Sequence, residues 1–201
     1  MSNSISLLRH GMPSLPWRTC LLTLLSIGLF MIFGSAPDIL VYKQETISNG
    51  ELWRLFSGHW VHSDLQHAQW DIAALLILGS LFEQTLRRQL FSVLMLSCLI
   101  ISISIIVFMP GLMAYCGLSG ILNSLFSYGI LQLWKSSRSA PLLLILLAGF
   151  LKNLIELHSH EAIFTDTLWP SVPEAHLLGL LTGVILFLIS TSKKHHWLTL
   201  E

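Results

Sequence analysis

The chain has 201 residues, of which 53% are hydrophobic and 11% charged, and its eleven Lys and Arg residues balance eleven Asp and Glu residues. A soluble domain carries about 25% charged residues. The composition therefore excludes a disordered chain, a basic nucleic-acid-binding protein and an ordinary soluble domain, because each needs more ionised surface. We expect an integral membrane protein that lies in a lipid bilayer and has no nucleic-acid partner.

Six apolar windows along the chain are long enough to cross a hydrocarbon core of about 30 Å. They cover residues 18–36, 64–82, 90–109, 117–134, 141–157 and 173–191. No repeat, low-complexity tract or linker separates them, which predicts one all-α domain of six transmembrane helices over residues 18–191. Residues 1–17 and 192–201 are expected to form short cytoplasmic tails.

The basic residues predict the orientation of these helices, because cytoplasmic loops of membrane proteins carry an excess of Lys and Arg. Eight of the eleven fall on one side of the predicted membrane: Arg9, Arg18, Arg87, Arg88, Lys135, Arg138, Lys193 and Lys194. Both termini are therefore expected in the cytoplasm. In this topology the second, fourth and sixth windows all begin at the outer face.

Polar residues occupy the outer ends of those three windows. His67 and Asp71 lie four residues apart in the second, Ser119 begins the fourth and His176 begins the sixth. A serine beside a histidine is the minimum for nucleophilic acyl transfer, because the imidazole takes the hydroxyl proton and returns it to the leaving amine. Gly117 would let the backbone approach a substrate, and backbone N–H groups at the helix start, with His67, would stabilise an oxyanion.

Each of these residues also has a structural explanation. Small residues are common where membrane helices pack, and a buried histidine can simply bridge two helices. The arrival of a serine and two histidines at one depth from three helices nevertheless favours a site. Gly179 and Gly183, four residues apart, predict close packing of the sixth helix against the fourth.

Metal and cofactor binding have little support in the sequence. The cysteines show no Cys-x-x-Cys spacing, and His59, His62 and His67 are separated by three and five residues without a cysteine. Structural or solvated roles for His59 and His62 are therefore favoured over a metal site. We assign no metal and no cofactor.

Three segments resemble motifs of the rhomboid family of intramembrane serine proteases. They are Glu51-Leu52-Trp53-Arg54, Gly117-Leu118-Ser119-Gly120, and Ala175-His176-Leu177-Leu178-Gly179 with Gly183. The resemblance implies Ser119 as the nucleophile and His176 as general base and acid, a dyad without the third carboxylate of soluble serine proteases. It implies that His67 assists the oxyanion hole with the backbone N–H of Ser119. Arg54 is expected to bind backbone carbonyls of the first outer loop.

Two positions differ from the commoner rhomboid pattern, and both leave alternatives open. Asp71 stands where the family usually has an asparagine. It could donate a hydrogen bond as a neutral acid, or pair as a carboxylate with protonated His67. A third alternative is a structural role, in which Asp71 only attaches its helix to a neighbouring one. Asn123 replaces an aromatic residue, and it either hydrogen-bonds His176 or makes a simple interhelical contact.

These departures resemble the rhombosortase branch, a bacterial inner-membrane group. The resemblance implies an active site that faces the periplasm and removes a Gly-Gly-containing C-terminal membrane anchor from exported proteins. Other functions stay open at this point. One is a catalytically inactive rhomboid-like protein that binds membrane helices, and another is a small transporter or haem-binding membrane protein.

Overall fold

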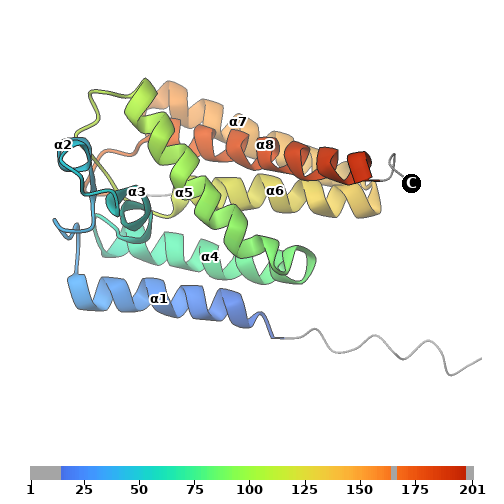
Figure 1. Ribbon diagram of the computed structural model, residues 1–201, viewed down its shortest axis with the longest axis horizontal. Helices are drawn as coiled ribbons and strands as arrows, with labels where there is room; N and C mark the ends of the chain where they lie inside the picture. Colours follow the sequence, from blue (N-terminus) through green and yellow to red (C-terminus); the bar gives the residue numbers. More distant parts are fainter. Residues whose placement is uncertain (1–14, 164–166, 198–201) are drawn as a thin grey trace, which may run out of the picture.

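The computed structural model describes residues 15–163 and 167–197. Most of the two predicted tails, residues 1–14 and 198–201, lies outside the described residues, as do residues 164–166. The described chain is mostly helical, and six long helices form a bundle (Figure 1). They are α1 (Trp17–Phe33), α4 (Leu65–Leu86), α5 (Gln89–Phe108), α6 (Ser119–Ser137), α7 (Ala140–Ser159) and α8 (Pro173–Trp197).

Short elements lie between α1 and α4 and between α5 and α6. They are β1 (Tyr42–Lys43), α2 (Gln44–Ser48), α3 (Arg54–Ser57), a 3₁₀ turn (Gly58–Trp60) and β2 (Ala114–Tyr115). In the described chain, three helices are both long and apolar enough to cross a membrane: α5, α7 and the Pro173–Ser192 part of α8. Helix α1 is apolar but shorter, with 17 residues, and α4 and α6 carry more polar residues.

Helix α6 is the centre of the bundle, where it contacts α4, α5, α7 and α8, while α1 packs against α4. Figure 1 shows that α4, α6 and α8 begin at the end of the bundle that carries α2 and α3. The start of α1 and the end of α8 lie at the opposite end. The first turns of α4, α6 and α8 are therefore close enough to contribute to one site.

Several helix boundaries differ from the apolar windows, and the largest difference is in α8, which continues to Trp197 and so includes residues that were expected to belong to the C-terminal tail. Residue Gly117 has φ +119°, outside the helical region, so α6 begins at Ser119, two residues after the start of the predicted window. Helix α4 continues to Leu86 and buries Glu83. The Glu83 carboxylate accepts hydrogen bonds from the backbone nitrogens of Arg18 and Thr19 at 3.1 and 2.8 Å, which caps the start of α1.

The first outer loop is tied to the bundle by polar contacts. Buried Arg54 donates from Nη1 to the carbonyl oxygens of Asp38 and Val41 at 2.5 and 2.7 Å, the role expected for it. Strand β1 pairs antiparallel with β2, and Tyr42 lies opposite Tyr115. The loop is thus joined to the segment that leads directly into Ser119.

Candidate active site

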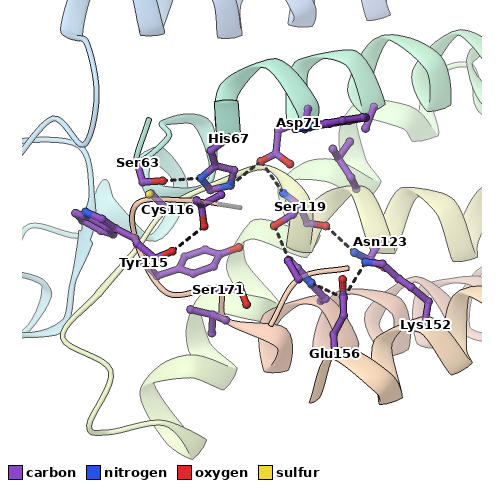
Figure 2. A pocket seen from close by; sticks show the side chains of 18 of the residues that line it. Ser63, His67, Asp71, Tyr115, Cys116, Ser119, Asn123, Lys152, Glu156 and Ser171 are labelled. Atoms are coloured by element: carbon purple, nitrogen blue, oxygen red, sulfur yellow. Dashed lines mark hydrogen bonds and ion pairs between the residues drawn. The ribbon is translucent and has the colours of Figure 1, made fainter. Parts of the chain in front are cut away.

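A cavity of about 570 Å³ lies between α4, α6, α7 and α8, and it is also lined by Ala162, Thr167 and residues 169–172. Trp70, Leu78 and Phe126 are among its apolar lining residues. Its polar lining residues include Ser63, His67, Asp71, Ser119, Asn123, Lys152, Glu156 and His176. Figure 2 shows the side chains of Ser119, Asn123 and Glu156 pointing into the same part of the cavity from α6 and α7.

Ser119 and His176 lie within hydrogen-bond distance, with 2.9 Å between Ser119 Oγ and His176 Nε2. Ser119 is the first residue of α6 and is half-buried, whereas His176, in the first turn of α8, is 8% exposed. A hydroxyl at this distance from an imidazole nitrogen can pass its proton to that nitrogen as it attacks an electrophile.

Two glycines on α8 permit the close approach of α6 and α8 that this distance requires. An added Cβ at Gly179 would lie 1.9 Å from the carbonyl oxygen of Gly120, and one at Gly183 would lie 2.1 Å from Ser127 Oγ. Ser127 Oγ itself donates to the carbonyl oxygen of Leu180 at 2.8 Å, across the same interface. Any side chain at either glycine would therefore separate the helices.

A carboxylate lies on the other side of the His176 ring, where the sequence reading expected none. Glu156 Oε2 is 3.0 Å from His176 Nδ1. Lys152 Nζ donates to the same oxygen at 2.8 Å, and the backbone N–H of Ile163 donates to Oε1 at 2.9 Å. With 1% of its side chain exposed, Glu156 is a buried and fully partnered carboxylate.

Asp71 faces the start of α6. Its Oδ2 accepts hydrogen bonds from the backbone nitrogens of Leu118 at 2.7 Å and Ser119 at 3.2 Å. His67 Nε2 and His62 Nε2 lie 3.3 and 3.4 Å from the same oxygen. Four nitrogens around one oxygen favour an ionised acceptor over the neutral acid that donates a hydrogen bond, one of the possibilities that the sequence left open.

The hydrogen bonds of His67 indicate its protonation. Ser63 Oγ donates to Asp64 Oδ2 at 2.7 Å, so its lone pair faces His67 Nδ1 at 3.0 Å. The Nδ1 atom must then carry a proton, and Nε2 needs a second proton to bind Asp71. An imidazolium paired with the Asp71 carboxylate satisfies both contacts.

Gly117 allows this cluster to form. Its φ of +119° is rare for residues with a side chain, and an added Cβ would lie 2.5 Å from His67 Nε2. The backbone N–H of Gly117 also donates to the carbonyl oxygen of Gly58 at 3.1 Å. A glycine is therefore required here both for the turn before α6 and for space beside His67.

Asn123 makes an interhelical contact and does not bind the imidazole of His176. Its Nδ2 donates to the carbonyl oxygen of Ser119 at 2.9 Å, and its Oδ1 accepts from Asn153 Nδ2 at 3.0 Å. The Asn153 amide also lies 3.4 Å from the carbonyl oxygen of His176. The two ring nitrogens of His176 are already occupied, Nε2 by Ser119 and Nδ1 by Glu156. Asn123 therefore joins α6 to α7 through Asn153.

Cys116 also lines the cavity, in the turn that leads to Ser119. Burial, together with the carboxylates of Asp71 and Asp64, raises the pKa of the Cys116 thiol to about 12. The thiolate is the nucleophilic form of cysteine, so this residue is inert at neutral pH. Cys20 and Cys98 are free thiols as well.

The outer-loop histidines point in different directions. His59 is fully buried and its Nε2 lies 3.1 Å from the carbonyl oxygen of Cys98, so it joins the loop to α5. His62 faces Asp71. Across residues 15–163 and 167–197, no three His, Cys, Asp or Glu side chains are grouped in a way that could hold a metal ion.

Glu156, Lys152 and Asn153 were not identified from the sequence, and His62 was expected to have a structural or solvated role without a link to Asp71. Lys152 and Glu156 lie four residues apart in a window that is otherwise apolar except for Asn153, and ionisable residues inside a membrane span are commonly functional. That spacing in the sequence could have predicted the Lys152–Glu156 ion pair. Nothing in the sequence predicts the contact between His62 and Asp71, because it depends on how the loop folds.

The comparisons with known proteins agree with the helical bundle. A family model described as the Rhomboid domain matches residues 49–193, which include Ser119, His176 and the cavity between them. No curated protein matches the chain.

Proposed function

The chain belongs to the rhomboid family, whose members are generally intramembrane serine proteases, and we propose that it is an active serine endopeptidase of this kind. In this proposal Ser119 is the nucleophile and His176 the general base and acid. The observation that carries it is the 2.9 Å contact between Ser119 Oγ and His176 Nε2 at the wall of a 570 Å³ cavity. Rhomboid proteases act on membrane-embedded substrates, which defines the substrate class.

The proposed reaction has two halves. Ser119 Oγ attacks the peptide carbonyl carbon while its proton passes to His176 Nε2, and the C–N bond then breaks as His176 gives that proton to the leaving amine. Water next attacks the acyl-serine ester, again losing a proton to His176. The ester C–O bond breaks, the proton on His176 returns to Ser119 Oγ, and the second product leaves as a carboxylic acid that releases its remaining proton to water.

An oxyanion forms in each half and needs hydrogen-bond donors. The backbone N–H of Ser119 and Nε2–H of His67 are the proposed donors, because both lie within 3.3 Å of the same oxygen, Asp71 Oδ2, beside the proposed nucleophile. The substrate carbonyl oxygen must compete with Asp71 for them. Gly117 leaves room for this exchange, since a side chain there would fill the space.

We propose that all six long helices cross the membrane, with both termini in the cytoplasm of a bacterial cell and the site facing the periplasm. The clustering of Lys and Arg beside the start of α1, after α4, after α6 and at the end of α8 supports this orientation. Polar groups within the membrane are tolerated where they are buried in protein or line a water-filled cavity. The cavity is therefore the expected route by which the hydrolytic water reaches Ser119.

The proposed substrate is the Gly-Gly-containing C-terminal membrane anchor of an exported protein, as in rhombosortases. A helical anchor must unwind before its carbonyl carbon can reach Ser119, and each glycine lowers helix stability by about 1 kcal/mol relative to alanine. Asp71 and Asn123, which differ from the commoner rhomboid residues, support this branch.

Labelling with a fluorophosphonate probe tests the nucleophile. Purified wild-type protein in detergent is expected to become labelled, and Ser119→Ala to lose the label completely. Ser136→Ala is the matched control, because Ser136 is exposed on the same helix and its hydroxyl donates to the Leu133 carbonyl oxygen one turn earlier. A folded wild-type protein that stays unlabelled would overturn the proposal and favour an inactive helix-binding protein.

A second assay tests the substrate separately. A secreted reporter with a Gly-Gly-containing C-terminal anchor is expected to be cleaved, and the same reporter with Leu-Leu in that place is not. Equal cleavage of both reporters, or of neither by a protein that labels normally, would reject the anchor specificity and leave the serine protease chemistry standing.

A further inference from the structure

The buried carboxylate behind His176 has no role in the two-residue mechanism above. The His176 ring lies between the serine and the carboxylate. Its Nε2 is 2.9 Å from Ser119 Oγ, and its Nδ1 is 3.0 Å from Glu156 Oε2. This is the order of groups in a serine–histidine–carboxylate triad. The three residues come from α6, α8 and α7, so the series depends on the packing of three helices.

Helix α7 presents few groups to the rest of the protein. The buried residues among its twenty are Asn153 and Glu156, and the remainder are partly or fully exposed and mostly apolar. Both buried residues are polar, and both contact His176: Asn153 at its backbone carbonyl oxygen and Glu156 at its ring. The inward face of α7 at this depth is therefore built around His176.

The position of Glu156 is defined on both of its oxygens. Lys152 Nζ and the backbone N–H of Ile163 donate to Oε2 and Oε1, and the Lys152 side chain remains 28% exposed while Glu156 is 1% exposed. Burial of a carboxylate is costly unless it is paired and hydrogen-bonded. If Glu156 served only to neutralise Lys152, the carboxylate would have no reason to be more deeply buried than the lysine.

We propose that Glu156 is a positioning residue for His176, which holds the ring in its reactive tautomer and stabilises the imidazolium that forms when Ser119 attacks. The inference rests on the proposed protease function. With Nδ1–H donated to Glu156, the lone pair of Nε2 faces Ser119 Oγ and can accept the hydroxyl proton. The Nδ1 proton stays on the ring throughout, and Glu156 stays ionised.

Two substitutions separate the charge of Glu156 from its shape. Glu156→Gln keeps the shape but removes the charge, while Glu156→Asp keeps the charge on a shorter side chain. We expect Glu156→Gln to lower kcat and the rate of fluorophosphonate labelling by about a hundredfold or more, with little change in KM. Glu156→Asp is expected to retain more of both rates. A role in packing alone predicts the opposite order.

A double variant tests whether the carboxylate matters only as the partner of Lys152. In Lys152→Met with Glu156→Gln the pair is removed together, so no uncompensated charge stays buried, and replacing buried ion pairs in this way is commonly neutral for stability. We expect this variant to fold and to remain as slow as Glu156→Gln. Recovery of wild-type rates would show that Glu156 acts only through the ion pair and would overturn the proposal.

The controls distinguish this inference from the proposed function. Glu161→Gln makes the same chemical change at an exposed carboxylate just beyond α7 and is expected to keep wild-type rates. If wild-type protein labels and Ser119→Ala does not, but Glu156→Gln labels as fast as wild type, the inference fails while the protease function stands. If wild-type protein does not label, the protease function fails first.

Discussion

Asp71 Oδ2 lies 3.2 Å from the backbone nitrogen of Ser119, the atom whose N–H the proposed mechanism assigns to the oxyanion. The same oxygen is 3.3 Å from His67 Nε2, the second proposed donor. The free protein therefore holds a carboxylate oxygen beside the donors that a substrate oxyanion would use. Its 2.7 Å hydrogen bond from Leu118 N also fixes the turn before α6.

Asp71→Asn is expected to keep cleavage activity and to raise kcat/KM by up to about tenfold. The amide oxygen still accepts from Leu118 N, but an uncharged acceptor binds Ser119 N–H and His67 less strongly than a carboxylate does. Rates of reporter cleavage measure the effect, and Asp38→Asn, at an exposed carboxylate paired with Lys43, is the matched control. A loss of activity as deep as that of Ser119→Ala would show that the carboxylate itself is required for catalysis.

The pH dependence of stability tests the burial of His59 in the outer loop. Burial lowers the pKa of His59 to about 4, against about 6.5 in the unfolded chain. Between these two pKa values, His59 is protonated in the unfolded state but neutral in the folded state. The contribution of neutral His59 is fully present above pH 6.5 and is lost as the pH falls toward 4, by on the order of 3 kcal/mol at most.

Unfolding of the detergent-solubilised protein at several pH values between 7.5 and 4 measures this loss. His59→Gln keeps a donor for the Cys98 carbonyl oxygen but does not titrate, so its stability is expected to fall less across this range. His158→Gln, at an exposed position on α7, should behave as wild type. Identical pH profiles for wild type and His59→Gln would contradict the assignment.

Much of the fold could be predicted because its main determinant is local. A run of apolar residues long enough to cross a bilayer marks a helix wherever its neighbours lie, and each of the six windows overlaps a long helix. The boundaries shifted where a single residue decides them. Gly117 leaves the helical region, so α6 starts two residues later. Helix α4 continues to Leu86, and Glu83 near its end caps the start of α1.

The site was only partly predictable for a related reason. Ser119 and His176 lie at helix starts, with Gly120 next to the serine and Gly179 three residues after the histidine, and this local pattern can be read from a single sequence. Glu156 lies inside one of the most apolar windows, and only the packing of α7 against α8 decides which side of that helix meets His176. His62 and Asp71 are nine residues apart across a loop, so no helical spacing relates them.

Gly179→Ala tests whether the contact between α6 and α8 holds the proposed catalytic pair together. Its Cβ would lie 1.9 Å from the Gly120 carbonyl oxygen, so α8 must move away and carry His176 from Ser119. Since a displacement of about 1 Å can cost a hundredfold in rate, we expect labelling and cleavage to fall by about that factor, and stability by about 1–3 kcal/mol. Gly28→Ala, where no atom lies within 4 Å of the added Cβ, is expected to leave activity unchanged. Wild-type labelling and unfolding temperature in Gly179→Ala would mean that the two helices are farther apart than the 2.9 Å contact requires.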